Sequence, residues 1–287
     1  MTEAPLIEAR DLRIGFGRGD GAVQAVRGVS FTLGREKLAI VGESGAGKSM
    51  IGRAIMRLSP AGARVTAERL AFRDIDLIAA SEKQMMDLRG RRIGLIMQDP
   101  KYSLNPVTPV GEQIAEAWRV HQPGRAGARE TRERVLAILE SVKIRDPARV
   151  AALYPHEISG GMGQRVMIAM MLIAGPDVLI ADEPTSALDV TVRLEVLKLL
   201  DELIASRGLG LIFISHDLNL VRGFCDRVII MYAGQIVETL AAADLARAEH
   251  PYTRGLLASL PSIRRPSQRL PTLTRDPRWL QPAGAAK

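Results

Sequence analysis

Gly42-Glu43-Ser44-Gly45-Ala46-Gly47-Lys48-Ser49 is the stretch of sequence that decides the fold. It fits the pattern G-x-x-x-x-G-K-[ST] and follows the apolar run Leu38–Val41. Glycines let the backbone wrap closely around phosphate, so successive N–H groups point inward, and the helix expected near Ser49 directs its positive end at the same anion. Lys48 is expected to pair with the outer phosphates, and the Ser49 hydroxyl to ligate Mg²⁺. The stretch therefore predicts a strand, a nucleotide-binding loop and a helix.

Three more short apolar runs lead directly into polar or glycine-bearing clusters. They are Ile93–Met97, Val178–Ala181 and Leu211–Ile214. Their alternation with helical patterns predicts an α/β fold with parallel strands. Because loops at the carboxyl ends of strands build the ligand crevice of an open α/β sheet, the clusters are expected to meet in space.

Other parts of the chain show different periodicities. The alternating segments Leu6–Phe16, Ala25–Leu33 and Arg69–Leu77 predict an antiparallel sheet near the N-terminus. The helical block Val110–Leu153 separates the second strand run from the third, which indicates an inserted subdomain.

Two further elements are predicted beyond residue 189, and the end of the chain differs from both. An amphipathic helix is expected over Val190–Ala205, with Leu194, Leu197 and Leu200 on one stripe. Arg227–Tyr232 and Gln235–Glu238 predict a hairpin, and beyond Pro261 the periodicity disappears, as in an extended segment.

Two adjacent carboxylates end the run Val178–Ala181. Asp182 suits a water-mediated Mg²⁺ contact, and Glu183 suits a general base that polarises the attacking water. A lone Asp-Glu pair can instead be a helix cap with a solvated neighbour, but the phosphate loop upstream favours catalysis.

Weaker signals come from single residues and from a second glycine-rich helix start. Ile158–Gln164 places Ser159, Gly160 and Gly161 at the start of an apolar helix, either as a second anion-binding terminus or as an ordinary cap. Gln98 can offer a neutral oxygen to a metal or water, and His216 can contact a γ-phosphate. Phe16 can stack on an adenine ring or pack in the core.

Composition and charge limit the function classes. The 287 residues are 47% hydrophobic and 25% charged, as in soluble globular proteins, and no apolar run approaches the roughly 18 residues of a membrane span. The single cysteine, Cys225, excludes an internal disulfide and an iron–sulfur cluster held by this chain alone. Residues 247–287 hold eight basic and two acidic residues, a net of +6 out of +7, so the near-neutral remainder argues against nucleic acid as a partner.

Taken in order, these motifs resemble those of the ATP-binding subunits of ABC transporters. The matching elements are the P-loop Gly42–Ser49, Gln98, the signature segment Ile158–Gln164, the strand Val178–Asp182 with Glu183, the D-loop Ser186–Asp189 and His216. The resemblance implies a P-loop NTPase (RecA-like) α/β core with an N-terminal antiparallel β subdomain and an inserted helical subdomain. It also implies that the chain is an ATPase with ATP and Mg²⁺ as cofactors.

The resemblance assigns a role to each site residue. Glu183 and His216 are the expected catalytic residues. The nucleotide-binding residues it implies are Phe16, Gly42, Glu43, Ser44, Gly45, Ala46, Gly47, Lys48, Ser49, Met50, Gln98, Ser159, Gly160, Gly161 and Asp189. The Mg²⁺ ligands it implies are Ser49, Gln98 and Asp182. The resemblance also implies a dimer, in which the signature segment of one subunit closes over the γ-phosphate held by the other.

A finer resemblance lies in Tyr154–Glu157 and in His250–Leu257, which look like the ATPase subunits of dipeptide, oligopeptide and nickel importers. It implies a second ATPase subunit (a paralogue or a second copy), two transmembrane permease subunits and an extracytoplasmic solute-binding protein. It places the chain on the cytoplasmic face of the bacterial inner membrane as a peripheral protein. Because the C-terminal tail has no cysteine cluster, no iron–sulfur cluster is expected. The alternative is a soluble ABC-type ATPase acting on nucleic acid or ribosomes.

The expected organisation is an ATP-binding domain over residues 1–245, with the helical subdomain at about 100–170 inserted in it. Residues 246–287 form a basic, partly extended C-terminal extension that can contact anionic headgroups or the membrane subunit. The sequence leaves open the solute, the identity of the ATPase partner and the role of the tail.

Overall fold

The computed structural model describes residues 4–17, 22–98, 103–122, 124, 126–186, 188–260, 276 and 279. Apart from those last two residues, the expected extended segment beyond Pro261 lies outside this range, as does Ala187 of the predicted D-loop. The chain divides into two compact units, one formed by Met1–Ala80 with Ile212–Lys287 and the other by Ser81–Leu211.

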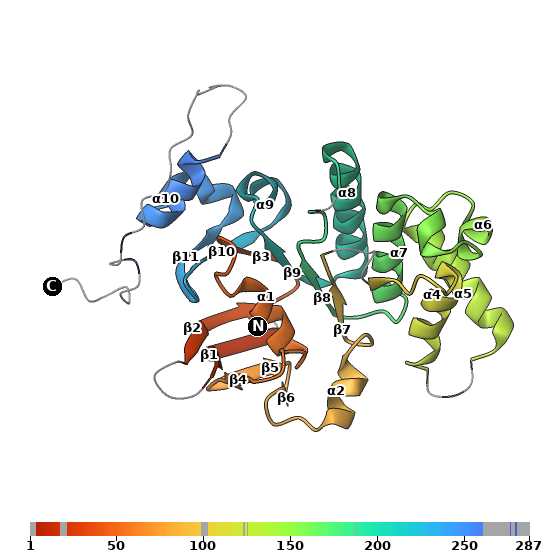
Figure 1. Ribbon diagram of the computed structural model, residues 1–287, viewed down its shortest axis with the longest axis horizontal. Helices are drawn as coiled ribbons and strands as arrows, with labels where there is room; N and C mark the ends of the chain where they lie inside the picture. Colours follow the sequence, from red (N-terminus) through yellow and green to blue (C-terminus); the bar gives the residue numbers. More distant parts are fainter. Residues whose placement is uncertain are drawn as a thin grey trace. The chain divides into compact units, whose positions relative to one another are not determined.

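The first unit contains the antiparallel sheet expected near the N-terminus, with strand order β2-β1-β5-β6 and β4 paired to β1 (Figure 1). Its strands are β1 (Ile7–Phe16), β2 (Val23–Leu33), β4 (Ala63–Thr66), β5 (Arg69–Phe72) and β6 (Ile75–Asp76). Leu12 and Ile14 are buried whereas Arg13 between them is exposed, so the alternating pattern forms a half-buried strand. The expected strand Arg69–Leu77 is interrupted by a turn, and its two halves pair with each other as β5 and β6.

The same unit holds the strands that lead into the glycine-rich loop and into His216, in the order β11-β10-β3-β9. They are β3 (Lys37–Val41), β9 (Gly210–Ser215), β10 (Arg227–Tyr232) and β11 (Gln235–Ala241). β10 is parallel to β3 and antiparallel to β11, which confirms the predicted hairpin. The unit also contains α1 (Lys48–Ile55), α9 (Leu218–Phe224), η3 (Ala242–Arg247) and α10 (Pro251–Ala258).

The second unit combines the parallel pair β7 (Ile93–Ile96) and β8 (Val178–Asp182) with a group of helices. The helices are α2 (Glu82–Leu88), α4 (Val110–Arg119), α5 (Ala128–Ser141), α6 (Pro147–Ala151), η2 (Pro155–Glu157), α7 (Gly160–Leu172) and α8 (Val190–Arg207). In Figure 1, α4, α5 and α6 lie together, and α4 and α5 also pack against α7. The helical block and the two apolar runs are therefore confirmed.

The stripe predicted on α8 is only partly buried. Leu197 and Leu200 are buried, as expected. Leu194, however, is 63% exposed, and nearby Val190 is also mostly exposed. The first turns of α8 therefore present apolar surface, and the helix packs mainly through its C-terminal two thirds.

Among the described residues, the model contains no helix with both the length and the apolar character needed to cross a membrane.

Candidate active site

The glycine-rich loop joins β3 to α1 in the first unit. Its last glycine, Gly47, caps α1 with φ of 90°, in the left-handed region that favours glycine. A Cβ atom at Gly42 would lie 2.2 Å from the carbonyl oxygen of Met231 on β10. Close backbone approach therefore requires glycine at the start of the loop, and the backbone turn into α1 favours it at the end.

Lys48, the first residue of α1, is buried although it carries a charge, with 6% of its surface exposed. Its ammonium group donates hydrogen bonds to the carbonyl oxygens of Gly42 (2.8 Å) and Glu43 (2.9 Å). The loop thus curls around a fixed positive charge at the N-terminus of a helix. At this position the backbone amides of the loop, the helix dipole and the ammonium group together stabilise an anion.

Phe16 and His216 are the other predicted site residues of the first unit. Phe16 is the half-buried last residue of β1 and pairs with Val23. His216 follows β9 directly and is exposed, and the next residue, Asp217, caps α9 by accepting from the N–H groups of Asn219 and Leu220. The strand-end placement of His216 matches the prediction.

In the second unit, Asp182 is the last residue of β8 and Glu183 follows it with φ of 48°. A non-glycine residue in the left-handed region is strained by about 1–2 kcal/mol, and such strain clusters at functional sites. The side-chain amide of Gln98, two residues after β7, lies 3.5 Å from the Glu183 carboxylate. The structure therefore brings Gln98 and Glu183 together.

Ser159 caps helix α7, with its hydroxyl oxygen accepting from the N–H of Met162 at 3.3 Å. Gly160 is exposed, whereas a Cβ atom at Gly161 would lie 2.6 Å from Cγ1 of Val192 on α8. This helix start thus has the ordinary cap geometry and also leaves a glycine-lined tip accessible.

Asp189 caps the following helix, α8, by accepting from the N–H of Val192 at 3.0 Å. Deeper in α7, Gln164 is 1% exposed, and neither of its side-chain amide atoms has a hydrogen-bond partner among the described residues. The sequence marked Gln164 as part of the signature segment but did not indicate that it is buried.

One contact to the glycine-rich loop has no signature in the sequence motifs. The backbone N–H of Glu43 donates a hydrogen bond of 3.1 Å to the hydroxyl oxygen of Tyr252, a fully buried residue on α10. Only the finer resemblance over His250–Leu257 drew attention to that segment, and nothing in the residue pattern linked it to the loop.

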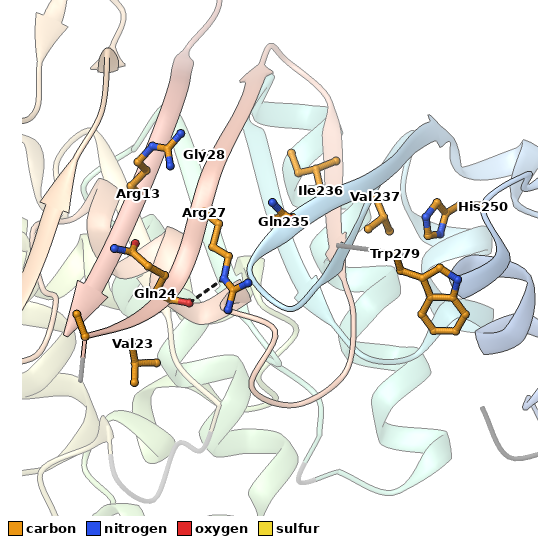
Figure 2. Close-up of a pocket in the computed structure, with 11 residues that line it drawn as sticks. Arg13, Val23, Gln24, Arg27, Gly28, Gln235, Ile236, Val237, His250 and Trp279 are labelled. Carbon is orange, nitrogen blue, oxygen red and sulfur yellow. Dashed lines mark hydrogen bonds between the residues drawn. The ribbon is translucent and has the colours of Figure 1, made fainter. Parts of the chain in front are cut away.

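The first unit also contains a cavity of about 960 Å³ beside the β1, β2 and β11 strands. Figure 2 shows Arg27, Gln235, His250 and Trp279 among its lining residues. None of the predicted site residues lines it, so the glycine-rich loop does not form part of the wall of this cavity.

Comparison with known proteins gives consistent matches. The model of the ABC transporter family matches residues 26–186. The oligopeptide transport ATP-binding protein OppD of Bacillus subtilis is 48% identical over 90% of this chain and 72% of its own length. The dipeptide transport ATP-binding protein DppD of Escherichia coli is 45% identical over 93% of this chain and 82% of its own length.

Among solved structures, a dimeric ATP-binding cassette in a post-hydrolysis state, bound to ADP and Pi, superposes with a TM-score of 0.70. It is 26% identical and covers 82% of this chain and 98% of its own. The protein cbiO1 of Clostridium perfringens, part of the transporter complex cbiONQ, has a TM-score of 0.69 and is 27% identical, over 85% of this chain and 92% of its own. The expected ABC ATPase fold is confirmed, and the matches in sequence and structure together establish that this chain belongs to the ABC transporter family.

Proposed function

We propose that this chain binds and hydrolyses ATP to energise a membrane importer for peptides or a related solute such as nickel. The glycine-rich loop carries the proposal, because it surrounds the buried ammonium of Lys48 at a helix N-terminus. Relatives whose names specify oligopeptide and dipeptide transport support the solute class, since they match nine tenths of the chain.

ATP binding would use Lys48, the loop amides and Phe16. The phosphates would replace the carbonyl oxygens of Gly42 and Glu43 as partners of Lys48, while loop amides hold the remaining oxygens. Phe16 would stack on the adenine ring, since it is half-buried at the end of β1.

Hydrolysis would depend on Glu183. Its carboxylate would accept a proton from the water that attacks the γ-phosphorus, as the bond from that phosphorus to the β–γ bridging oxygen breaks. His216 would contact the γ-phosphate. The strained backbone of Glu183 and its proximity to Gln98 support this role.

Mg²⁺ fits the proposed donor set of Ser49, Gln98 and Asp182, whose hydroxyl, amide and carboxylate oxygens are the ligands that this hard cation prefers. When bound, the ion would neutralise charge on the β- and γ-phosphates. Cys225 alone cannot ligate an iron–sulfur cluster, so none is expected in this chain.

The proposed assembly is a dimer with a second ATPase subunit, either a paralogue or a copy of this chain. Ser159, Gly160 and Gly161 would close over the partner's nucleotide, and Asp189 would line the interface. This chain would bind at the cytoplasmic face of the bacterial inner membrane as a peripheral subunit. Two transmembrane permease subunits and an extracytoplasmic solute-binding protein would complete the importer. Residues 1–245 would form the ATP-binding domain, with the helical subdomain at about 100–170, and residues 246–287 the C-terminal extension.

Reconstitution tests this function. The chain would be tagged, expressed with the permease, ATPase and binding-protein genes that neighbour its own, and purified from membranes. We expect the chain to co-purify with the permeases. We also expect ATP-dependent uptake of labelled peptide or nickel into proteoliposomes, and this uptake should be lost in the Lys48→Ala variant. Purification with RNA or ribosomes and without membrane subunits would instead support a soluble ATPase and overturn the proposal.

A further inference from the structure

The peptide group between Gly42 and Glu43 is held from both ends. Its carbonyl oxygen accepts a hydrogen bond from Lys48 at 2.8 Å, and its N–H donates one to the hydroxyl oxygen of Tyr252 at 3.1 Å. Because a peptide group is planar and rigid, these two contacts fix the orientation of the first peptide of the phosphate loop.

Tyr252 is itself rigidly placed. It is completely buried, and its ring packs against those of Tyr232 and Trp279, with centroids 4.6 Å and 5.7 Å away. Its backbone N–H donates to Nδ1 of His250 at 3.2 Å, which caps α10. The hydroxyl therefore presents a fixed acceptor to the loop.

The support for Tyr252 extends to β11. Oε1 of Glu238 accepts from the N–H groups of Glu249 (2.7 Å) and His250 (3.3 Å), which ties the start of α10 to that strand. Figure 2 shows His250 and Trp279 beside β11 at one end of the cavity. A segment more than 200 residues beyond the loop in sequence thus reaches it through packed and hydrogen-bonded neighbours.

The two contacts to the peptide group differ in what ATP does to them. Under the proposed function, Lys48 turns toward the phosphates and its hydrogen bond to Gly42 weakens. The bond to Tyr252 engages the N–H of Glu43 and not the Lys48 ammonium, so it can persist when Lys48 turns away. It would then be the contact that keeps the Glu43 peptide from rotating while the neighbouring amides bind phosphate.

We propose that Tyr252 is a positioning residue for the phosphate loop, holding the Glu43 amide so that the loop is preorganised for ATP. The inference rests on the proposed ATP binding. Without the hydroxyl, the loop must be ordered at the moment of binding, so affinity falls while the groups that act in the chemical step are unchanged.

The test compares Tyr252→Phe with Tyr232→Phe in the full chain. Both variants remove one phenolic hydroxyl from the same aromatic cluster and keep the ring, but it is the Tyr252 hydroxyl that accepts the hydrogen bond from Glu43. Mg-ATP affinity would be measured by equilibrium titration, and KM and kcat would be measured for ATP hydrolysis in the assembled importer. For Tyr252→Phe, Kd and KM should rise about three- to tenfold, as expected for one hydrogen bond, with kcat within about twofold. Tyr232→Phe should match wild type.

Amide hydrogen exchange of Glu43, followed by NMR, gives a second readout that a general loss of stability would not mimic. In the wild-type chain this amide should exchange much more slowly than an exposed loop amide, and Tyr252→Phe should accelerate it selectively. Because the wild-type measurement needs no variant, fast exchange there overturns the inference even if Tyr252→Phe does not fold.

The outcomes distinguish a failure of the proposed ATP-binding function from a failure of the role proposed for Tyr252. A wild-type chain that binds no Mg-ATP overturns the proposed function and this inference with it. A wild-type chain that binds ATP, with unchanged affinity in Tyr252→Phe or an equal loss in Tyr232→Phe, leaves the function standing and overturns the role of Tyr252.

Discussion

Gly47 of the phosphate loop lies against Ala25 of β2 so closely that a Cβ atom there would be 2.3 Å from the Ala25 carbonyl oxygen. Two constraints therefore act on Gly47, because its φ of 90° is also strained for any residue with a side chain. The glycine in the loop motif is thus explained by packing against the antiparallel sheet as well as by phosphate binding.

Gly47→Ala should destabilise the first unit and impair nucleotide binding. The left-handed strain and the clash with backbone predict a loss of more than about 2 kcal/mol in unfolding free energy, measured by urea denaturation. Gly223→Ala is the control, since a Cβ atom at Gly223 on α9 meets no atom of the described residues within 4 Å. Similar small effects for both substitutions would show that the loop can shift away from β2.

Lys48→Ala should weaken Mg-ATP binding itself by about 10- to 100-fold, the contribution of charge-assisted hydrogen bonds to phosphate. Isothermal titration of the purified chain measures this. Lys83→Ala removes an exposed ammonium from α2 and serves as the charge-matched control. Retention of wild-type ATP affinity in Lys48→Ala would contradict the assignment of the phosphate loop.

Ser159 offers a way to separate helix capping from phosphate contact. Ser159→Ala removes the acceptor for the Met162 N–H and should cost about 1 kcal/mol in stability. Ser159→Asp keeps a cap acceptor but places a carboxylate where the partner's γ-phosphate is proposed to lie. It should therefore fold normally yet lose ATP-driven association with the other ATPase subunit, as measured by analytical ultracentrifugation. Normal association of Ser159→Asp would exclude the proposed contact.

His250 should make stability depend on pH. Burial lowers the pKa of this imidazole below its usual 6.5, and the nearby Glu238 carboxylate opposes that shift. The unfolded chain then binds the proton more tightly than the native one, so unfolding free energy should fall as pH drops through 6.5 toward the native pKa. Protonation also removes the Nδ1 acceptor that caps α10.

His250→Asn keeps a capping acceptor but does not titrate, so it should flatten this dependence between pH 7.5 and 5.5 in urea denaturation. Burial also lowers the pKa of His121, which leaves part of the slope in place. His156→Asn, at an exposed position, is the control. An unchanged slope in His250→Asn would contradict the contribution of His250.

The strand runs and the helical block could be predicted because their signal is local. Each parallel strand is a short apolar run that ends at a polar or glycine-bearing cluster, so its position follows from burial and from the loop that succeeds it. The loop motif likewise carries its own conformation, since Gly47 must be left-handed. Glu183 and Gln98 could be placed because both follow strand ends.

Other features depend on neighbours that one sequence window does not contain. Leu194 fits a buried helical stripe by spacing, but its burial depends on what faces α8, and in this chain it is exposed. Tyr252 stands in the sequence only as part of the segment His250–Leu257, and its bond to Glu43 arises from the pairing of β10 with β3 and the packing of α10. The positive φ of Glu183 also has no signature in residue type.

Glu183→Gln tests the central claim most directly, because it retains the shape and hydrogen-bonding capacity of the side chain but removes its basicity. Two quantities are measured: the single-turnover rate of ATP hydrolysis by the assembled importer and the equilibrium affinity for Mg-ATP. Glu140→Gln, at an exposed position on α5, is the control. We expect ATP affinity within a few-fold of wild type and hydrolysis slowed by about 10²- to 10⁴-fold, with ATP trapped in the complex. Hydrolysis at the wild-type rate in Glu183→Gln would contradict the account.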